Sequence, residues 1–111
     1  MRSAFEAIAA RRNVFVTVDA MHEKAAVPTS PRANAAISAA IAEVAGHGAR
    51  TIMSGAGHDG QAMAHLTDIG MIFVRCRGGI SHNPAEHVSA ADMGLAIEAL
   101  IATIGRLAAA L

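Results

Sequence analysis

Two glycine-containing segments of this 111-residue sequence place histidine close to carboxylates. Residues 54–60 read SGAGHDG and contain His58 and Asp59, and residues 78–87 read GGISHNPAEH and contain His82. Neutral imidazole nitrogens and carboxylate oxygens are the groups that bind zinc and related divalent ions. Glycines beside them let the backbone approach a ligand closely. Both segments are therefore candidates for a metal or substrate site.

His82 is the candidate metal ligand of the second segment. A ligand histidine needs a partner for its other ring nitrogen, and Ser81, Asn83 and Glu86 are close enough in sequence to supply one. The alternative is a surface loop whose polar side chains only meet solvent, because one histidine does not make a metal site. The residues alone leave both interpretations open.

The first segment allows three interpretations. It could cradle phosphate, as glycine-rich turns before helices do, although it lacks the lysine and the spacing of a P-loop. It could line a substrate pocket with His58 and backbone amides. It could also be a tight strand-to-helix turn that Asp59 caps.

The hydrophobic pattern predicts alternating helices and strands. Apolar residues at helical spacing indicate helices, and short β-branched or apolar runs indicate strands. We expect helices over residues 3–12, 32–45, 59–66 and 90–111, and strands over residues 14–18, 50–53 and 71–74.

From residue 32 onward the order is helix, strand, helix, strand, helix, which predicts an α/β fold with parallel strands. The loops after the strands would then meet at the carboxyl edge of the sheet, where ligands bind, and bring His58 near His82. Two short strands do not make a self-sufficient sheet, and buried parallel strands need neighbours. We therefore expect a fragment, or a subunit completed by association.

Composition excludes several classes of protein. The net charge is zero and no basic stripe or aromatic platform is present, which argues against nucleic acid as a partner. No apolar run reaches the ~18 residues that a membrane span needs. The absence of a targeting segment and the single cysteine, Cys76, favour the cytoplasm.

Taken together, three motifs resemble the amidase/hydantoinase/carbamoylase family of the zinc aminopeptidase-like clan. They are SGAGHD at 54–59, GMIFV at 70–74 and GISHNPAE at 79–86. This family includes N-carbamoyl-L-amino acid hydrolases, allantoate amidohydrolases and β-ureidopropionases. The resemblance covers nearly the whole chain and is specific to the family, though not to one substrate.

The resemblance implies a domain organisation. In the family, an α/β catalytic domain holds two metal ions, usually zinc, manganese or cobalt, and an inserted α+β domain makes the dimer. Residues 1–20 would end the inserted domain, residues 21–31 would form the return hinge, and residues 32–111 would be the C-terminal part of the catalytic domain.

The resemblance also implies roles for single residues. His82 matches the last metal ligand of the family, and Gly79, Ile80 and Ser81 match the loop that approaches the substrate. The first segment, with His58 and Asp59, matches a pocket-lining part of the site and not a metal ligand. Asn83 and Glu86 are likewise expected to line the pocket or to support His82 without binding metal themselves.

Most of the family's catalytic machinery lies upstream of the matched segment and is absent here. The missing groups are two histidines, a bridging aspartate and a glutamate that bind metal, the glutamate general base, and the arginine and asparagine that hold the substrate carboxylate. No residue of this chain is therefore assigned a catalytic role, because one histidine cannot hold two metal ions.

The sequence supports three hypotheses of function. The first is the C-terminal fragment of a metal-dependent amidohydrolase that acts on linear amides such as N-carbamoyl amino acids and ureido acids. That fragment would be inactive without the remaining chain or a homodimer. The second is a non-enzymatic remnant or assembly partner. The third is a small phosphate-binding α/β domain that uses residues 54–60.

Overall fold

The computed structural model describes residues 2–19, 21 and 25–110. Its helices are α1 (Arg2–Arg12), α2 (Pro31–Ala45), α3 (Gly60–Met63), the 3-10 turn η1 (Arg77–Gly79) and α4 (Ala90–Ala109). The helices predicted over residues 3–12, 32–45 and 90–111 are confirmed to within two residues at their described ends. Leu111, the predicted last residue of the final helix, lies outside the described residues.

Local chemistry fixes the ends of α2 and α4. Ser30 caps α2 by accepting the backbone N–H of Ala33, and proline occupies the first helical position, where its missing N–H costs nothing. The helix ends at Gly46, whose φ of 71° is left-handed and suits glycine. Ser89 caps α4 in the same way, accepting the N–H of Asp92 at 3.0 Å.

The helix predicted over residues 59–66 is wrong in length, because α3 ends at Met63. Asp59 has helical backbone angles and its side chain makes no capping hydrogen bond, so the first turn lacks the stabilisation that a cap gives. After Met63 the chain tightens into turns, in which His65 and Leu66 donate to carbonyls three residues back.

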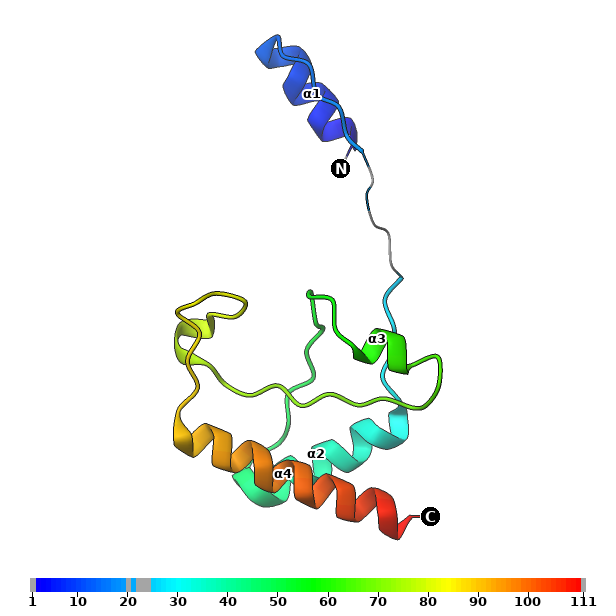
Figure 1. Cartoon of the computed structure of the whole chain (residues 1–111), viewed down its shortest axis with the longest axis vertical. Helices are drawn as coiled ribbons and strands as arrows, with labels where there is room; N and C mark the ends of the chain where they lie inside the picture. The colour runs from blue at the N-terminus through cyan, green and yellow to red at the C-terminus, as the bar shows by residue number, and fades with distance from the viewer. Residues whose placement is uncertain (1, 20, 22–24, 111) are drawn as a thin grey trace.

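α2 and α4 pack against each other and hold the only core in the described part of the chain (Figure 1). The buried side chains are small or medium in size, which lets the two helices approach closely: Ala33, Ile37, Ala40, Ala99 and Thr103. The Thr103 hydroxyl donates to the Ala99 carbonyl at 2.7 Å, so its burial leaves no polar group unpaired. An Arg106–Glu43 ion pair joins the two helices at the surface.

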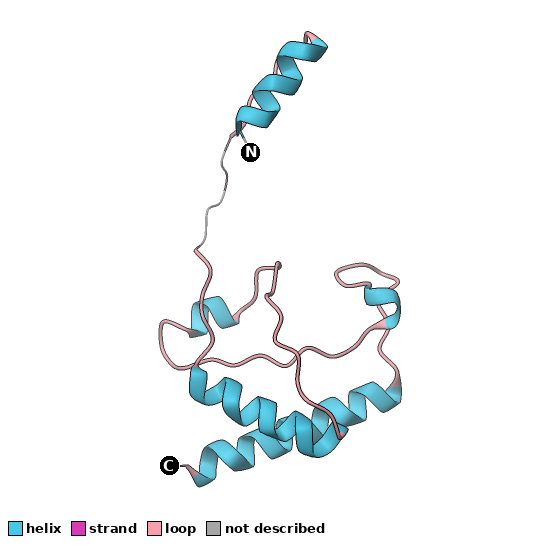
Figure 2. Ribbon diagram, turned by 180° about the vertical axis from the view of Figure 1, so that it is seen from behind, coloured by secondary structure: helices cyan, strands magenta, loops and turns pink. Residues whose placement is uncertain are grey.

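No β-strand forms within the described residues, and the α/β sheet is therefore unconfirmed (Figure 2). The segments 14–18, 50–53 and 71–74 lie outside the helices, and no backbone group of the last two hydrogen-bonds any other described residue. A strand exists only when a neighbour pairs with its backbone. The described residues supply no such neighbour for segments 50–53 and 71–74.

α1 stands apart from the helical pair. It has no buried residue, and among the described elements it makes no contact with α2 or α4. The chain turns at Asn13, whose φ of 50° is left-handed, and Val14 donates to the Ala9 carbonyl. Residues 22–24 of the predicted hinge lie outside the described residues, and the domain boundaries stay predictions.

Candidate metal-ligand loop and groove

The loop that carries His82 lies on the side of the extended segments opposite α2 and α4 (Figure 1). Its base is closed by a hydrogen bond of 2.8 Å from the Arg77 amide to the His87 carbonyl. Gly78 and Gly79 both have left-handed backbone angles, φ 66° and 68°, which only glycine adopts without strain. This turn, η1, reverses the chain and directs it toward His82.

His82 is an exposed residue in the left-handed region, with φ 55°. Its backbone N–H donates to Glu86 Oε2 at 3.0 Å, and the Ser81 hydroxyl donates to Glu86 Oε1 at 3.4 Å. Asn83 Oδ1 accepts the Ala85 amide at 2.9 Å. The sequence predicted that one of these side chains would hold the His82 ring. In the described chain Asn83 and Glu86 accept backbone amides of the loop, and the Ser81 hydroxyl bonds the Glu86 side chain.

The three residues predicted to face a substrate are displayed just before His82. Gly79 ends η1, Ile80 donates its amide to the Arg77 carbonyl, and the Ile80 side chain is 39% exposed. Gly79, Ile80 and Ser81 are all exposed, and their role beside a substrate stays a prediction.

His58 is positioned differently. Its Nδ1 accepts the Gly60 amide at 2.9 Å. A neutral imidazole that accepts at Nδ1 carries its proton on Nε2. His58 therefore presents an N–H donor rather than the free lone pair that a metal requires. Asp59 is exposed beside it, and its carbonyl accepts the amides of Ala62 and Met63.

His58 also lines an apolar groove of about 650 Å³. The groove runs between α2, α4 and the segment 67–74, and its walls include Ile37, Ile97, Leu100 and Ile104. Neither His82 nor its loop contributes to this groove. In the described chain the two loops extend to the same side of the molecule (Figure 1), but no hydrogen bond joins them. The predicted approach of His58 and His82 stays a prediction.

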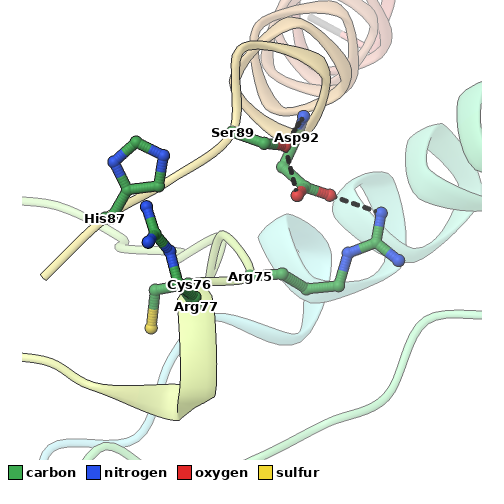
Figure 3. A pocket seen from close by; sticks show the side chains of 6 residues that line it. All are labelled: Arg75, Cys76, Arg77, His87, Ser89 and Asp92. Atoms are coloured by element: carbon green, nitrogen blue, oxygen red, sulfur yellow. Dashed lines mark hydrogen bonds and ion pairs between the residues drawn. The ribbon is translucent and has the colours of Figure 1, made fainter.

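A second pocket, of about 330 Å³, lies between the base of the loop and the start of α4. It is lined by Arg75, Cys76, Arg77, His87, Ser89 and Asp92. Figure 3 shows Arg75 reaching Asp92, to which it is bonded at 2.6 Å, while Ser89 contacts the other carboxylate oxygen at 2.6 Å. The sequence analysis missed this cluster, although the Ser-x-x-Asp pattern at residues 89–92 is a capping signal.

The Asp92 carboxylate makes the cluster sensitive to acid. The Ser89 hydrogen bond lowers the pKa of Asp92 below its usual 3.8, with help from the Arg75 charge and against the opposing effect of desolvation. A depressed carboxyl pKa adds stability above the unfolded-state value, and that stability is lost as the pH falls through the folded-state value. Asp92→Asn should therefore destabilise the chain at neutral pH, with the difference from wild type shrinking below pH 3.8.

Urea midpoints for wild type and Asp92→Asn, measured at about pH 7 and again at about pH 3, test this expectation. Glu98→Gln is the control, because Glu98 is an exposed carboxylate on the same helix. A gap between wild type and Asp92→Asn that stays constant with pH contradicts the assignment.

The candidate site residues thus fall into two separate parts, an exposed histidine in a hydrogen-bonded loop and an apolar groove that His58 lines. No group of three His, Cys, Asp or Glu side chains among the described residues could hold a metal ion.

The chain belongs to the peptidase family M20/M25/M40, whose model matches residues 9–106. It is 44% identical over 93 residues to the allantoate deiminase of Arabidopsis thaliana, covering 78% of this chain and 18% of that protein. It is 39% identical over 103 residues to the N-carbamoyl-L-amino acid amidohydrolase of Geobacillus stearothermophilus, covering 93% and 25%. The allantoate amidohydrolase of Bacillus subtilis (strain 168) is 31% identical over 108 residues, covering 97% and 26%.

These matches confirm the resemblance drawn from the three motifs. The chain spans roughly a fifth to a quarter of the length of these curated relatives. No solved structure matches it significantly. No helix in the described part of the chain combines the length and the apolar character needed to cross a bilayer.

Proposed function

We propose that this chain supplies the C-terminal part of the catalytic domain of a metal-dependent amidohydrolase. Its reaction is hydrolysis of C–N bonds in linear amides, such as N-carbamoyl amino acids and ureido acids. The observation that carries the proposal is the braced His82 loop in a chain whose relatives are named allantoate and N-carbamoyl amino acid amidohydrolases.

The donor set fits one metal ligand and no more. His82 offers an exposed imidazole, the donor type that zinc, manganese and cobalt accept. The described residues contain no group of three His, Cys, Asp or Glu side chains that could hold an ion, so the remaining ligands would come from elsewhere. When bound, a divalent ion supplies Lewis acidity, which polarises a carbonyl oxygen and acidifies a bound water.

The other loop residues would bind and orient the amide. The backbone of Gly79, Ile80 and Ser81 lies open beside His82 and offers peptide groups to a substrate. The Nε2–H of His58 would donate a hydrogen bond to substrate, with Asp59 beside it. Asn83 and Glu86 would act through the loop they brace.

The domain assignment belongs to the same proposal. Residues 1–20 would end an inserted dimerisation domain, residues 21–31 would be the hinge and residues 32–111 the catalytic part. The absence of contacts between α1 and the α2–α4 pair, within the described residues, supports a boundary in this region. We keep the cytoplasm as the proposed location.

The partner that completes the fold would be the remaining chain or a second copy. The apolar face of α4 needs cover, since Ile97, Leu100, Ile101 and Ile104 are each at least half exposed. The unpaired backbone of residues 50–53 and 71–74 needs neighbouring strands. Both requirements are met by the rest of an α/β catalytic domain.

The non-enzymatic alternative also has an observation in its favour, which is the lack of a three-donor metal group in the described chain. The two proposals differ in what happens when the missing part is supplied. A remnant stays inactive in any assembly, whereas a catalytic segment restores activity to an enzyme that lacks its own.

The test has two arms. The purified chain with added Mn²⁺ or Zn²⁺ should hydrolyse no N-carbamoyl-L-amino acid, because one imidazole cannot hold the ions. A chimera should hydrolyse it, in which this chain replaces the matching quarter of the Geobacillus amidohydrolase. Metal-dependent turnover by the chain alone contradicts the fragment proposal, and a folded but inactive chimera favours the remnant.

A further inference from the structure

The backbone of His82 is held in a conformation that its residue type disfavours. Only two non-glycine residues of the described chain have positive φ, Asn13 at 50° and His82 at 55°. Asn13 ends a helix, where asparagine commonly adopts this conformation. His82 stands within a loop and is bulkier, so its left-handed angle persists only when surrounding contacts impose it.

Those contacts converge on one carboxylate. Glu86 Oε2 accepts the His82 amide at 3.0 Å, while Oε1 accepts the Ser81 hydroxyl at 3.4 Å. The Glu86 amide in turn donates to the Asn83 carbonyl at 2.9 Å. Glu86 is thus hydrogen-bonded to three residues that precede it, to two through its carboxylate and to one through its amide. Charge-assisted bonds of this kind are stronger than neutral ones.

A residue's φ angle decides on which side of the backbone its side chain leaves. If His82 relaxed to an extended φ, its imidazole would leave the loop in another direction, while Gly79 and Ile80 stayed where η1 puts them. The direction of the ring relative to the exposed peptide groups therefore depends on the bond from the His82 amide to Glu86.

We propose that Glu86 is a positioning residue, whose carboxylate fixes the left-handed backbone of His82 and thereby the direction of its imidazole. The inference rests on the proposed function only for what the ring then binds. In this role Glu86 holds the backbone of His82, and it neither binds metal nor hydrogen-bonds the His82 ring.

NMR of the isotopically labelled chain without metal tests the proposal. In wild type, the His82 amide should exchange slowly with solvent, and its three-bond coupling and Cα shift should report a left-handed φ. Glu86→Ala should speed exchange of that amide by about tenfold or more, since a charged acceptor is lost. The changes should be confined to residues 78–87 and leave the signals of α2 and α4 in place.

Two further variants separate positioning from general stabilisation. Glu86→Gln should largely keep the left-handed signature, because its side-chain carbonyl can still accept the His82 amide. Glu98→Ala removes an exposed carboxylate from α4 and should leave the His82 signals unchanged.

Three results overturn the proposal: a freely exchanging His82 amide in wild type, a left-handed signature that survives Glu86→Ala, or Glu86→Ala changes that spread equally through α2 and α4. Because no metal or substrate is present, these results are independent of the chimera. An inactive chimera with the expected spectra contradicts the proposed function alone, and an active chimera without them contradicts only the role of Glu86.

Discussion

Replacing His82 with alanine in the active chimera is expected to lower kcat/KM for an N-carbamoyl-L-amino acid by about a thousandfold or more. Lewis-acid stabilisation by a bound ion is worth several kcal/mol, and each ~1.4 kcal/mol is a tenfold change in rate. His82 is the residue proposed as the metal ligand, and its backbone amide is hydrogen-bonded to Glu86, so its replacement should have the largest effect on activity.

Metal content should fall together with activity. Elemental analysis of the dialysed chimera is expected to show less bound metal per protomer in His82→Ala than in the parent. His47→Ala provides the matched control, because His47 is an exposed histidine beyond the end of α2, where its Nδ1 contacts only a neighbouring carbonyl. Equal losses in the two variants, or full metal content in His82→Ala, would remove His82 from the metal site.

The second large effect concerns stability. Gly70→Ala is expected to destabilise the chain by about 1–3 kcal/mol, the range typical of overpacking. A Cβ at this position would lie 2.9 Å from both the Ala33 Cβ and the Ile37 Cδ1. The Ile37 tip can move aside, but the Ala33 methyl is fixed to α2, so the helix or the segment must shift.

Gly48→Ala is the control for Gly70→Ala. Both glycines lie outside the helices without a left-handed φ, but a Cβ at Gly48 would meet nothing within 4 Å. Each substitution reduces the freedom of the unfolded chain by the same amount, so the difference between them measures the steric cost alone. Urea denaturation gives that difference as a shift in midpoint at constant m-value. Equal midpoints would mean that residue 70 does not press against α2.

The segment that contains Gly70 is also held to the helical pair by hydrogen bonds and an ion pair at its two ends. The Ser30 amide donates to the Ile69 carbonyl at 2.8 Å, and the Ser30 hydroxyl donates to Asp68 at 3.1 Å. These bonds and the Arg75–Asp92 ion pair fix the two ends of the segment 69–75 to the starts of α2 and α4. The segment is therefore anchored without a single ladder hydrogen bond.

Three helices were predictable because their signals are local. Serine at residues 30 and 89 supplies the caps, Pro31 and Gly46 mark the ends of α2, and the apolar spacing marks the buried faces. The helix at residues 59–66 was predicted too long, since nothing in the pattern revealed that Asp59 would leave the first turn uncapped. The predicted strands do not form within the described residues. A strand depends on a neighbour that pairs with its backbone, and the described residues supply none.

By itself, the sequence determined the family and the candidate residues. The motifs at residues 54–59 and 79–86 indicated His58 and His82 as candidates, because residue type alone decides which atoms can bind metal. The lack of the family's other metal ligands from this sequence led to the prediction of a partial site. Only the tertiary structure decided how the loops are held. In the structure the Glu86 carboxylate accepts the backbone amide of His82. The Gly60 amide donates to His58 Nδ1, which leaves Nε2 of His58 as an N–H donor. Backbone angles and hydrogen-bond partners arise from the closed turn, and no spacing of residues specifies them.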